Sequence, residues 1–330
     1  TECVGLVSEL EAQYGAVKYI ALSSAALEHK LFVKPFAAAF PSAQVWVAPN
    51  QWSFPVNIPF EFGMFPQKVT GVIADVDSED ASNMPWANEL EAKVLGVGGS
   101  KYTGYVKPWF TDIAWFHKAS QTVLVTDSVL KVPVDPIPLY EDDPTALLMR
   151  AVDEVGTGPA PDTPENRRKG WWRVVLFATF VAPSTQERVK LAYDGFQWEE
   201  GWEEAFENFA DRLIVPPILR VLCFNRRPED VLAWADRVAQ WPFKYVVPTH
   251  FDAPIEANPK EFLRAFNWLR YPVEGRKKGL DGLKLANLFG DKKDNAVFLE
   301  KDLAYLRELD ADTVKQGTSE EPRVYGPPPS

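Results

Sequence analysis

The sequence has 330 residues, of which 46% are hydrophobic and 13% aromatic, which is enough apolar material for one large domain or two ordinary ones. Its formal net charge of −11 argues against nucleic-acid binding through a basic face, because phosphate contacts need clustered Lys and Arg. The two cysteines, Cys3 and Cys223, are far apart in the sequence and give no sign of a disulfide framework or a cysteine-rich zinc site.

The first residues of the chain predict alternating helices and strands. Apolar side chains recur at helical spacing over 3–14, and Gly15 follows as a helix stop. A strand-like run covers 17–24, a second helix interrupted by a proline covers 26–43, and another strand covers 44–49. This order of helix, strand, helix and strand predicts an α/β protein in which the two strands are parallel.

Two stretches in the middle of the chain, 50–100 and 131–170, show no clear period and are predicted to be long loops. Strand-like segments lie between them at 112–117 and 122–126. The most apolar run, 171–184, contains an arginine and is too short to cross a membrane. We expect this run to be a buried strand or helix, with a surface that docks on a membrane or a partner as the alternative.

Helical spacing returns in the last third of the chain, in the segments 202–222, which two prolines break, 228–241 and 258–270. The segment 244–255 predicts a strand that runs into a loop. Nothing divides the chain into separately folding units, so we expect a single domain over 1–315 and a Pro-rich tail over 316–330.

Polar residues that can bind metals lie at the ends of predicted strands. His29, His117 and His250, the only three histidines, each lie at such an end, and Asp127 closes another strand. Ligands gather beyond strand ends in α/β folds, and imidazole and carboxylate are ordinary ligands of zinc, iron and manganese. From the residues alone, four hydrogen-bonded structural residues are the favoured interpretation, and a metal site is the alternative.

Three segments in chain order, YIALSSAALEHK, FHKASQTVLVTD and YVVPTHF, resemble the ordered motifs of the metallo-β-lactamase fold. With PWANELEAKVL, RRKGWWRVVLF and DRLIVPPILRVL, most of the chain resembles a divergent branch of that fold, a family of unknown function from cyanobacteria and plastids. The resemblance implies a metallo-β-lactamase-like αββα sandwich. The strands that usually open that fold are not found, so the sandwich is expected to lack them and to need another chain over its exposed edge.

The resemblance also implies a set of metal ligands. Glu28 and His29 fall on two ligand positions of the family's metal-binding loop, and Asp127 and His250 fall on two later ones. These four residues are therefore the implied ligands of a single zinc ion, or of iron or manganese. His117 falls on a ligand position of the other metal of the family.

That other metal is expected to be lost. Its two ligand positions in the loop fall on Ser24 and Ala26, which replace the histidines of the family. His117 then remains as an additional ligand of the single ion or as a proton shuttle. The resemblance assigns no further catalytic residue, and no cofactor other than the metal.

Two functions remain open at this point, beside a redox or ligand-binding role that nothing specific in the sequence favours. The sequence favours a degenerate, non-catalytic protein without a metal, which acts as a structural or assembly partner in a plastid protein complex. The resemblance implies a location in the chloroplast stroma or at the stromal face of the thylakoid, where a thylakoid membrane complex would be the partner. The candidate docking residues are aromatic and lie in the long loops, with a local core as the alternative: Trp52, Phe54, Phe60, Phe62, Trp86 and Trp109.

The second function is a mononuclear metal-dependent hydrolase of an ester, thioester, lactone or phosphodiester. A zinc ion with three protein ligands and an open position lowers the pKa of its bound water to about 7, which makes the water a nucleophile at neutral pH. Loss of the second metal would remove part of the charge that stabilises the transition state in a two-metal site.

Overall fold

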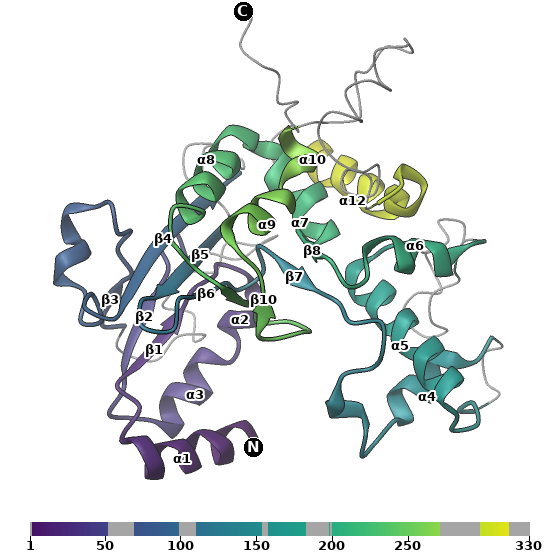
Figure 1. Ribbon diagram of the computed structural model, residues 1–330, viewed down its shortest axis with the longest axis horizontal. Coiled ribbons are helices and arrows are strands. Elements are labelled where there is room, and N and C mark those ends of the chain that lie inside the picture. Colours follow the sequence, from purple (N-terminus) through teal and green to yellow (C-terminus); the bar gives the residue numbers. More distant parts are fainter. Residues whose placement is uncertain are drawn as a thin grey trace, which may run out of the picture.

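The computed structural model describes residues 2–51, 69–98, 110–153, 158–182, 198, 200–270 and 298–316 (Figure 1). Helices and strands are mixed in these ranges, so the expected α/β class is confirmed. The first helix, α1 (Glu2–Tyr14), ends at the predicted position, where Gly15 has a φ of +96°. A residue without a Cβ adopts this left-handed conformation at little cost, so Gly15 can end the helix.

A small parallel sheet follows α1, in the order β1-β2-β3, and its strands are β1 (Tyr19–Leu22), β2 (Gln44–Val47) and β3 (Gly71–Val72). The predicted parallel pairing of the first two strands is therefore confirmed. Two short helices, α2 (Leu27–Lys30) and α3 (Val33–Ala39), connect them. The break between the helices comes before the proline, because Pro35 lies in the first turn of α3, where a missing N–H costs no hydrogen bond.

A five-stranded sheet in the order β10-β9-β6-β5-β4 forms the centre of the molecule. Its strands are β4 (Leu90–Val97), β5 (Phe110–His117), β6 (Thr122–Leu124), β9 (Tyr245–Val247) and β10 (Ile255–Glu256). Neighbouring strands are antiparallel except for β6 and β9, which are parallel. The parallel pair matters for the candidate site, because parallel strands end at the same edge of a sheet.

The strand β4 lies within the range 50–100 that we predicted to be a long loop. Its apolar pattern is interrupted by Lys93, which is nonetheless buried. The ammonium group of Lys93 lies 4.2 Å from the centre of the Trp241 ring and donates to the carbonyl oxygen of Arg237. A lysine that packs its alkyl chain and pairs its charge can occupy a buried strand position, and the apolar pattern does not reveal it.

Both faces of β5 are buried, and its side chains alternate between two cores. Ile113 and Trp115 pack with Trp86 in a small core that also contains residues following β2 and β3. Ala114 and Phe116 point the other way, into the large core formed with the helices. The central sheet therefore lies between the small parallel sheet and the helices.

The helices of the large core are α4 (Thr145–Ala151), α5 (Pro164–Thr179), α6 (Trp202–Phe209), α7 (Pro217–Leu222), α8 (Pro228–Val238), α9 (Pro259–Arg264), α10 (Asn267–Arg270) and α12 (Ala304–Lys315). They lie above the central sheet and to its right in Figure 1. A two-stranded sheet of β7 (Leu130–Lys131) and β8 (Leu213–Ile214) links the two regions. The range 131–170, which we predicted to be a long loop, contains α4 and the first turns of α5, so that prediction was wrong for these residues.

The most apolar run of the sequence is helical over most of its length, in α5. The indole N–H groups of Trp171 and Trp172 donate to the carbonyl oxygens of Pro133 and Val134, both at 2.9 Å. These bonds fix α5 against the segment after β7. No helix in the described ranges is long and apolar enough to cross a membrane.

The predicted docking residues can be followed only in part. Trp86 is buried between Trp46 and Trp115, with ring centres 5.1 and 5.3 Å away, so it belongs to a local core. The other candidates lie outside the described residues: Trp52, Phe54, Phe60, Phe62 and Trp109. The predicted tail also lies outside them, except for its first residue, Gln316.

Candidate metal site

His29 reaches the central sheet through a loop that is fixed by hydrogen bonds. Ser24 forms an isolated β-bridge with Asp112, and the N–H of Ala25 donates to the carbonyl oxygen of Thr111 at 2.8 Å. The hydroxyl of Ser24 accepts from the N–H of Ala26 at 3.1 Å. The loop after β1 is thus tied to the first residues of β5, and α2 then places His29 at the edge of the central sheet.

Asp127 and His250 come from the two parallel strands of that sheet. Asp127 lies three residues after the end of β6, and His250 lies three residues after the end of β9. The hydrogen bond from the N–H of Thr249 to the carbonyl oxygen of Thr126 keeps the segments that follow β6 and β9 side by side. Because β6 and β9 are parallel, both side chains emerge at the same edge, as expected for ligands in α/β folds.

The three side chains meet at one point. The carboxylate of Asp127 lies between the two imidazoles, with Oδ2 at 2.9 Å from Nε2 of His29 and Oδ1 at 3.0 Å from Nε2 of His250. The candidate ligand atoms of all three residues lie within 4.8 Å of one another. The side chains of His29 and Asp127 are 15% and 13% exposed, and that of His250 is 47% exposed, so the group opens to solvent on one side.

The backbone that carries Asp127 is held by a second, fully buried carboxylate, that of Asp112. One oxygen of Asp112 accepts from the N–H of Ile113 at 2.8 Å. The other accepts from the N–H groups of Asp127 at 3.3 Å and Ser128 at 3.0 Å. We did not single out Asp112 in the sequence, although a carboxylate within the apolar strand FTDIAWFH is an unusual residue that could have been noticed.

The two carboxylates have opposite pKa shifts. Burial and the negative charge of Asp127 together raise the pKa of Asp112 to about 7, although the hydrogen bonds that Asp112 accepts lower it. Burial also raises the pKa of Asp127, but the hydrogen bonds from His250 and His29 outweigh this and lower it to about 2. Burial lowers the pKa of His29, but the hydrogen bond and charge of Asp127 give a net increase. Asp127 is therefore an ionised carboxylate at neutral pH.

Glu28 and His117 do not join this group. Glu28 is exposed on α2, and successive residues of a helix point about 100° apart, so Glu28 and His29 do not face the same point. His117 lies at the far end of β5, where its Nδ1 is 2.7 Å from the hydroxyl of Ser120. His117 is five positions after Asp112 along β5, a distance of about 16 Å in an extended strand. The structure thus brings together three of the five residues that the sequence suggested.

The group fits a single metal ion. Zinc with bonds of about 2.0–2.2 Å needs ligand atoms roughly 3.4 Å apart in a tetrahedral arrangement. The separations here, from 2.9 to 4.8 Å, bracket that value. Two imidazoles and a carboxylate suit zinc, iron or manganese, and three protein ligands leave positions for water and substrate.

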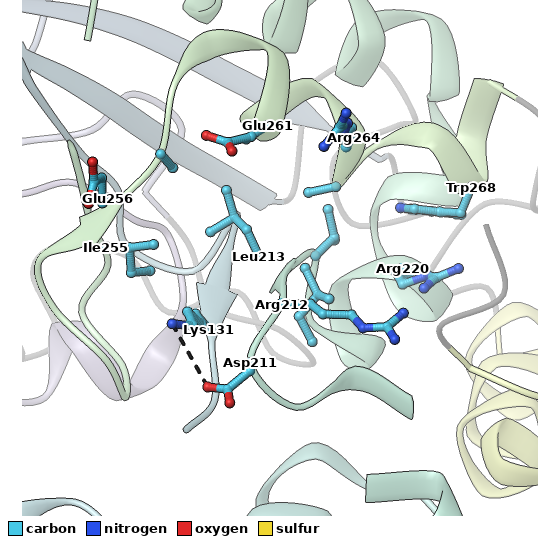
Figure 2. Close-up of a pocket in the computed structure, with 14 residues that line it drawn as sticks. Lys131, Asp211, Arg212, Leu213, Arg220, Ile255, Glu256, Glu261, Arg264 and Trp268 are labelled. Atoms are coloured by element: carbon cyan, nitrogen blue, oxygen red, sulfur yellow. Dashed lines mark ion pairs between the residues drawn. The ribbon is translucent and has the colours of Figure 1, made fainter. Parts of the chain in front are cut away.

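An apolar cleft of about 710 Å³ begins at the group. His29 lines it, and so do Thr126 and Thr249, the residues immediately before Asp127 and His250. Figure 2 shows a different cavity, of about 310 Å³, lined by charged side chains such as Arg212 and Glu256. None of the three residues of the group lines that second cavity.

The fold and the site define a mixed α/β protein with a His–Asp–His group where two parallel strands end. The family model of a domain of unknown function, DUF4336, matches residues 1–268, and the chain belongs to this family. No curated protein and no solved structure matches the chain.

This result corrects the resemblance drawn from the sequence. The match is to a domain family of unknown function, and nothing in the comparisons points to a metallo-β-lactamase-like family. The three segments that suggested the resemblance contain all five implied residues, and two of these, Glu28 and His117, lie apart from the group. The αββα sandwich that the resemblance implied is not confirmed beyond the general α/β class.

Proposed function

We propose that the protein binds one transition-metal ion through His29, Asp127 and His250, and that it is a metal-dependent hydrolase. The observation that supports this is the convergence of their three ligand atoms within 4.8 Å at the edge of the central sheet. The residues come from α2 and from the segments after β6 and β9. Hydrogen bonds hold the backbone of Asp127, the residue before His250 and the loop that leads to α2.

The chemistry of such a site follows from the number of its ligands. A metal ion with three protein ligands and an open position polarises a carbonyl group and makes water a nucleophile at neutral pH. Asp127 supplies a negative charge to the ion because its pKa is about 2. Asp112 keeps the backbone of Asp127 in place, as its hydrogen bonds show, and so acts as a positioning residue.

Metal analysis of the purified chain tests this proposal. After reconstitution with Zn, Fe(II) or Mn and removal of free metal, we expect close to one equivalent of one of these ions per chain. His29→Gln and His250→Gln each remove one ligand and are expected to lower the bound metal strongly. His117→Gln is the matched control, because His117 lies at the opposite end of β5 and should leave the metal content unchanged.

The result that overturns the proposal is equally specific. Less than about a tenth of an equivalent of metal, with no gain on reconstitution, would mean that the group is a hydrogen-bonded structural cluster. Bound metal that is insensitive to His29→Gln and His250→Gln would place the ion elsewhere.

A second function, that of a structural or assembly partner in a plastid complex, is favoured by a different observation. No residue of α1 is buried, and Leu6, Leu10 and Tyr14 are 62%, 53% and 75% exposed. An exposed apolar helix face of this kind is typical of an interaction surface. The plastid location itself stays a prediction, and fractionation of native complexes would test it.

A further inference from the structure

The cleft that begins at His29 is almost free of charge. No Asp, Glu, Lys or Arg side chain lines it among the described residues. Its walls come from both sheets and from α3, and the large apolar residues among them include Leu22, Phe32, Trp86, Trp115, Leu124 and Val247. A concave surface of this composition is typical of a site that binds an apolar small molecule.

The cleft and the candidate metal site are continuous. His29 belongs to both, and Thr126 and Thr249 place the cleft wall one residue from Asp127 and from His250. A molecule in the cleft therefore has one end at the proposed metal and the rest along β1. Leu124 and Phe32 are 36% and 70% exposed, so apolar surface is available for a ligand to cover.

We propose that the substrates are carboxylic esters, thioesters or lactones with an apolar acyl group, which lies in this cleft while the carbonyl carbon lies at His29. This inference rests on the proposed hydrolase function and narrows its substrate class. A phosphodiester is disfavoured, because the described lining of the cleft contains no Lys or Arg to pair with a phosphate.

The reaction is a balanced hydrolysis. The oxygen of water forms a bond to the acyl carbon, and the bond from that carbon to the leaving oxygen or sulfur breaks. One proton of the water goes to the leaving alcohol or thiol, and the product is the carboxylic acid. No oxidant, reductant or second substrate is required.

The dependence of rate on acyl length tests the proposal. The full chain, reconstituted with zinc, is assayed with p-nitrophenyl esters from acetate to decanoate. Each methylene that enters an apolar site contributes about 0.8 kcal/mol, so kcat/KM is expected to rise by about fourfold per methylene until the cleft is filled. Free decanoic acid, which is not a substrate, is expected to inhibit hydrolysis of the longer esters competitively. Its inhibition constant measures binding in the cleft.

Leu124→Asp places a charge in the cleft at a position that is partly exposed. We expect a loss of kcat/KM that grows with acyl length, with no change in metal content. Leu139→Asp is the matched control, because Leu139 is 78% exposed and is not part of the cleft. It should leave the whole length profile unchanged.

The possible failures are distinguishable. Absence of metal overturns the proposed function and this inference together. Bound metal and ester hydrolysis without any dependence on acyl length overturn only the substrate class. The cleft could instead hold an extended peptide paired with β1, which is bonded only to β2 among the described strands. Slow amide hydrogen exchange at Tyr19 and Ala21 that appears only on addition of an extended peptide, with no competition by decanoic acid, would support that occupant and overturn the inference.

Discussion

The strands β5 and β6 run side by side, and their two ends have different environments. At one end, Asp112 is fully buried and fixes the backbone of Asp127, which meets two imidazoles. At the other end, His117 is near the surface and pairs with Ser120 in the turn between the strands. The first end combines buried charge, fixed backbone and convergent ligands, and the second has an ordinary surface hydrogen bond.

This difference follows from the direction of the strands. Because β5 and β6 are antiparallel, the last residues of β5 pair with β6, and the segment that follows β6 runs back along the first residues of β5. Asp112 and Asp127 are therefore neighbours, although 15 positions separate them. His117 is nearer to Asp127 in sequence, but the turn carries it to the opposite edge. A site assembled from strand ends therefore depends on which ends lie next to each other in the sheet.

The largest effect is expected for Asp127→Asn. The change removes the ionised carboxylate that touches both imidazoles. Removal of a residue that hydrogen-bonds to a metal ligand costs roughly 10–100-fold in metal affinity. Removal of the charge of a ligand itself should therefore cost more than about 100-fold. Competition with a chromophoric chelator measures this. Asp135→Asn, at an exposed ion pair with Arg168, should leave the affinity unchanged.

Asp112→Ala tests whether the buried carboxylate fixes this edge of the sheet. It leaves the N–H groups of Ile113, Asp127 and Ser128 without their acceptor in a buried region. Each such group costs about 1–3 kcal/mol, and partial relaxation makes a total loss of about 2–4 kcal/mol in unfolding free energy reasonable. Urea denaturation measures it. Asp112→Asn keeps one acceptor oxygen and should lose less, and equal losses would contradict this account.

Ser24→Ala is expected to have a smaller effect. It removes the acceptor for the N–H of Ala26 in the loop that leads to His29, at a cost of about 1 kcal/mol in stability. Metal affinity should fall only severalfold, since His29 itself remains. Ser78→Ala, in an exposed turn where the hydroxyl donates to the carbonyl oxygen of Asp75, is the control. A loss of affinity as large as that of Asp127→Asn would show that the loop alone positions the ligand.

Part of this site could be predicted from the sequence, and the limit has a physical cause. Local pattern located the strand ends that carry Asp127 and His250, because strands and turns leave marks in neighbouring residues. His29 was predicted just after a strand and instead lies on α2. The pairing of β6 with β9 is between distant segments and left no such mark. Glu28 was proposed by resemblance, and the helical turn of α2 directs it away from the group.

The fold shows the same limit. The strands β1 and β2 and their parallel pairing were predicted from alternation along the chain, and the structure confirms them. The strand β4 was missed because Lys93 interrupts its apolar pattern, and the contacts that allow this lysine to be buried, with Trp241 and Arg237, are about 145 residues away. Asp112 was missed for a related reason, since its role depends on backbone groups of a neighbouring strand.

The smallest effect is expected for His117→Ala, and it is the most direct test of the contrast between the two ends. The change removes one hydrogen bond to Ser120 near the surface, so the unfolding free energy should change by less than about 0.5 kcal/mol. Metal affinity, measured as for Asp127→Asn, should stay within about twofold, because the length of β5 separates His117 from the ligands. A loss of more than about tenfold would mean that His117 reaches the metal, and the two ends of β5 and β6 would then form a single site.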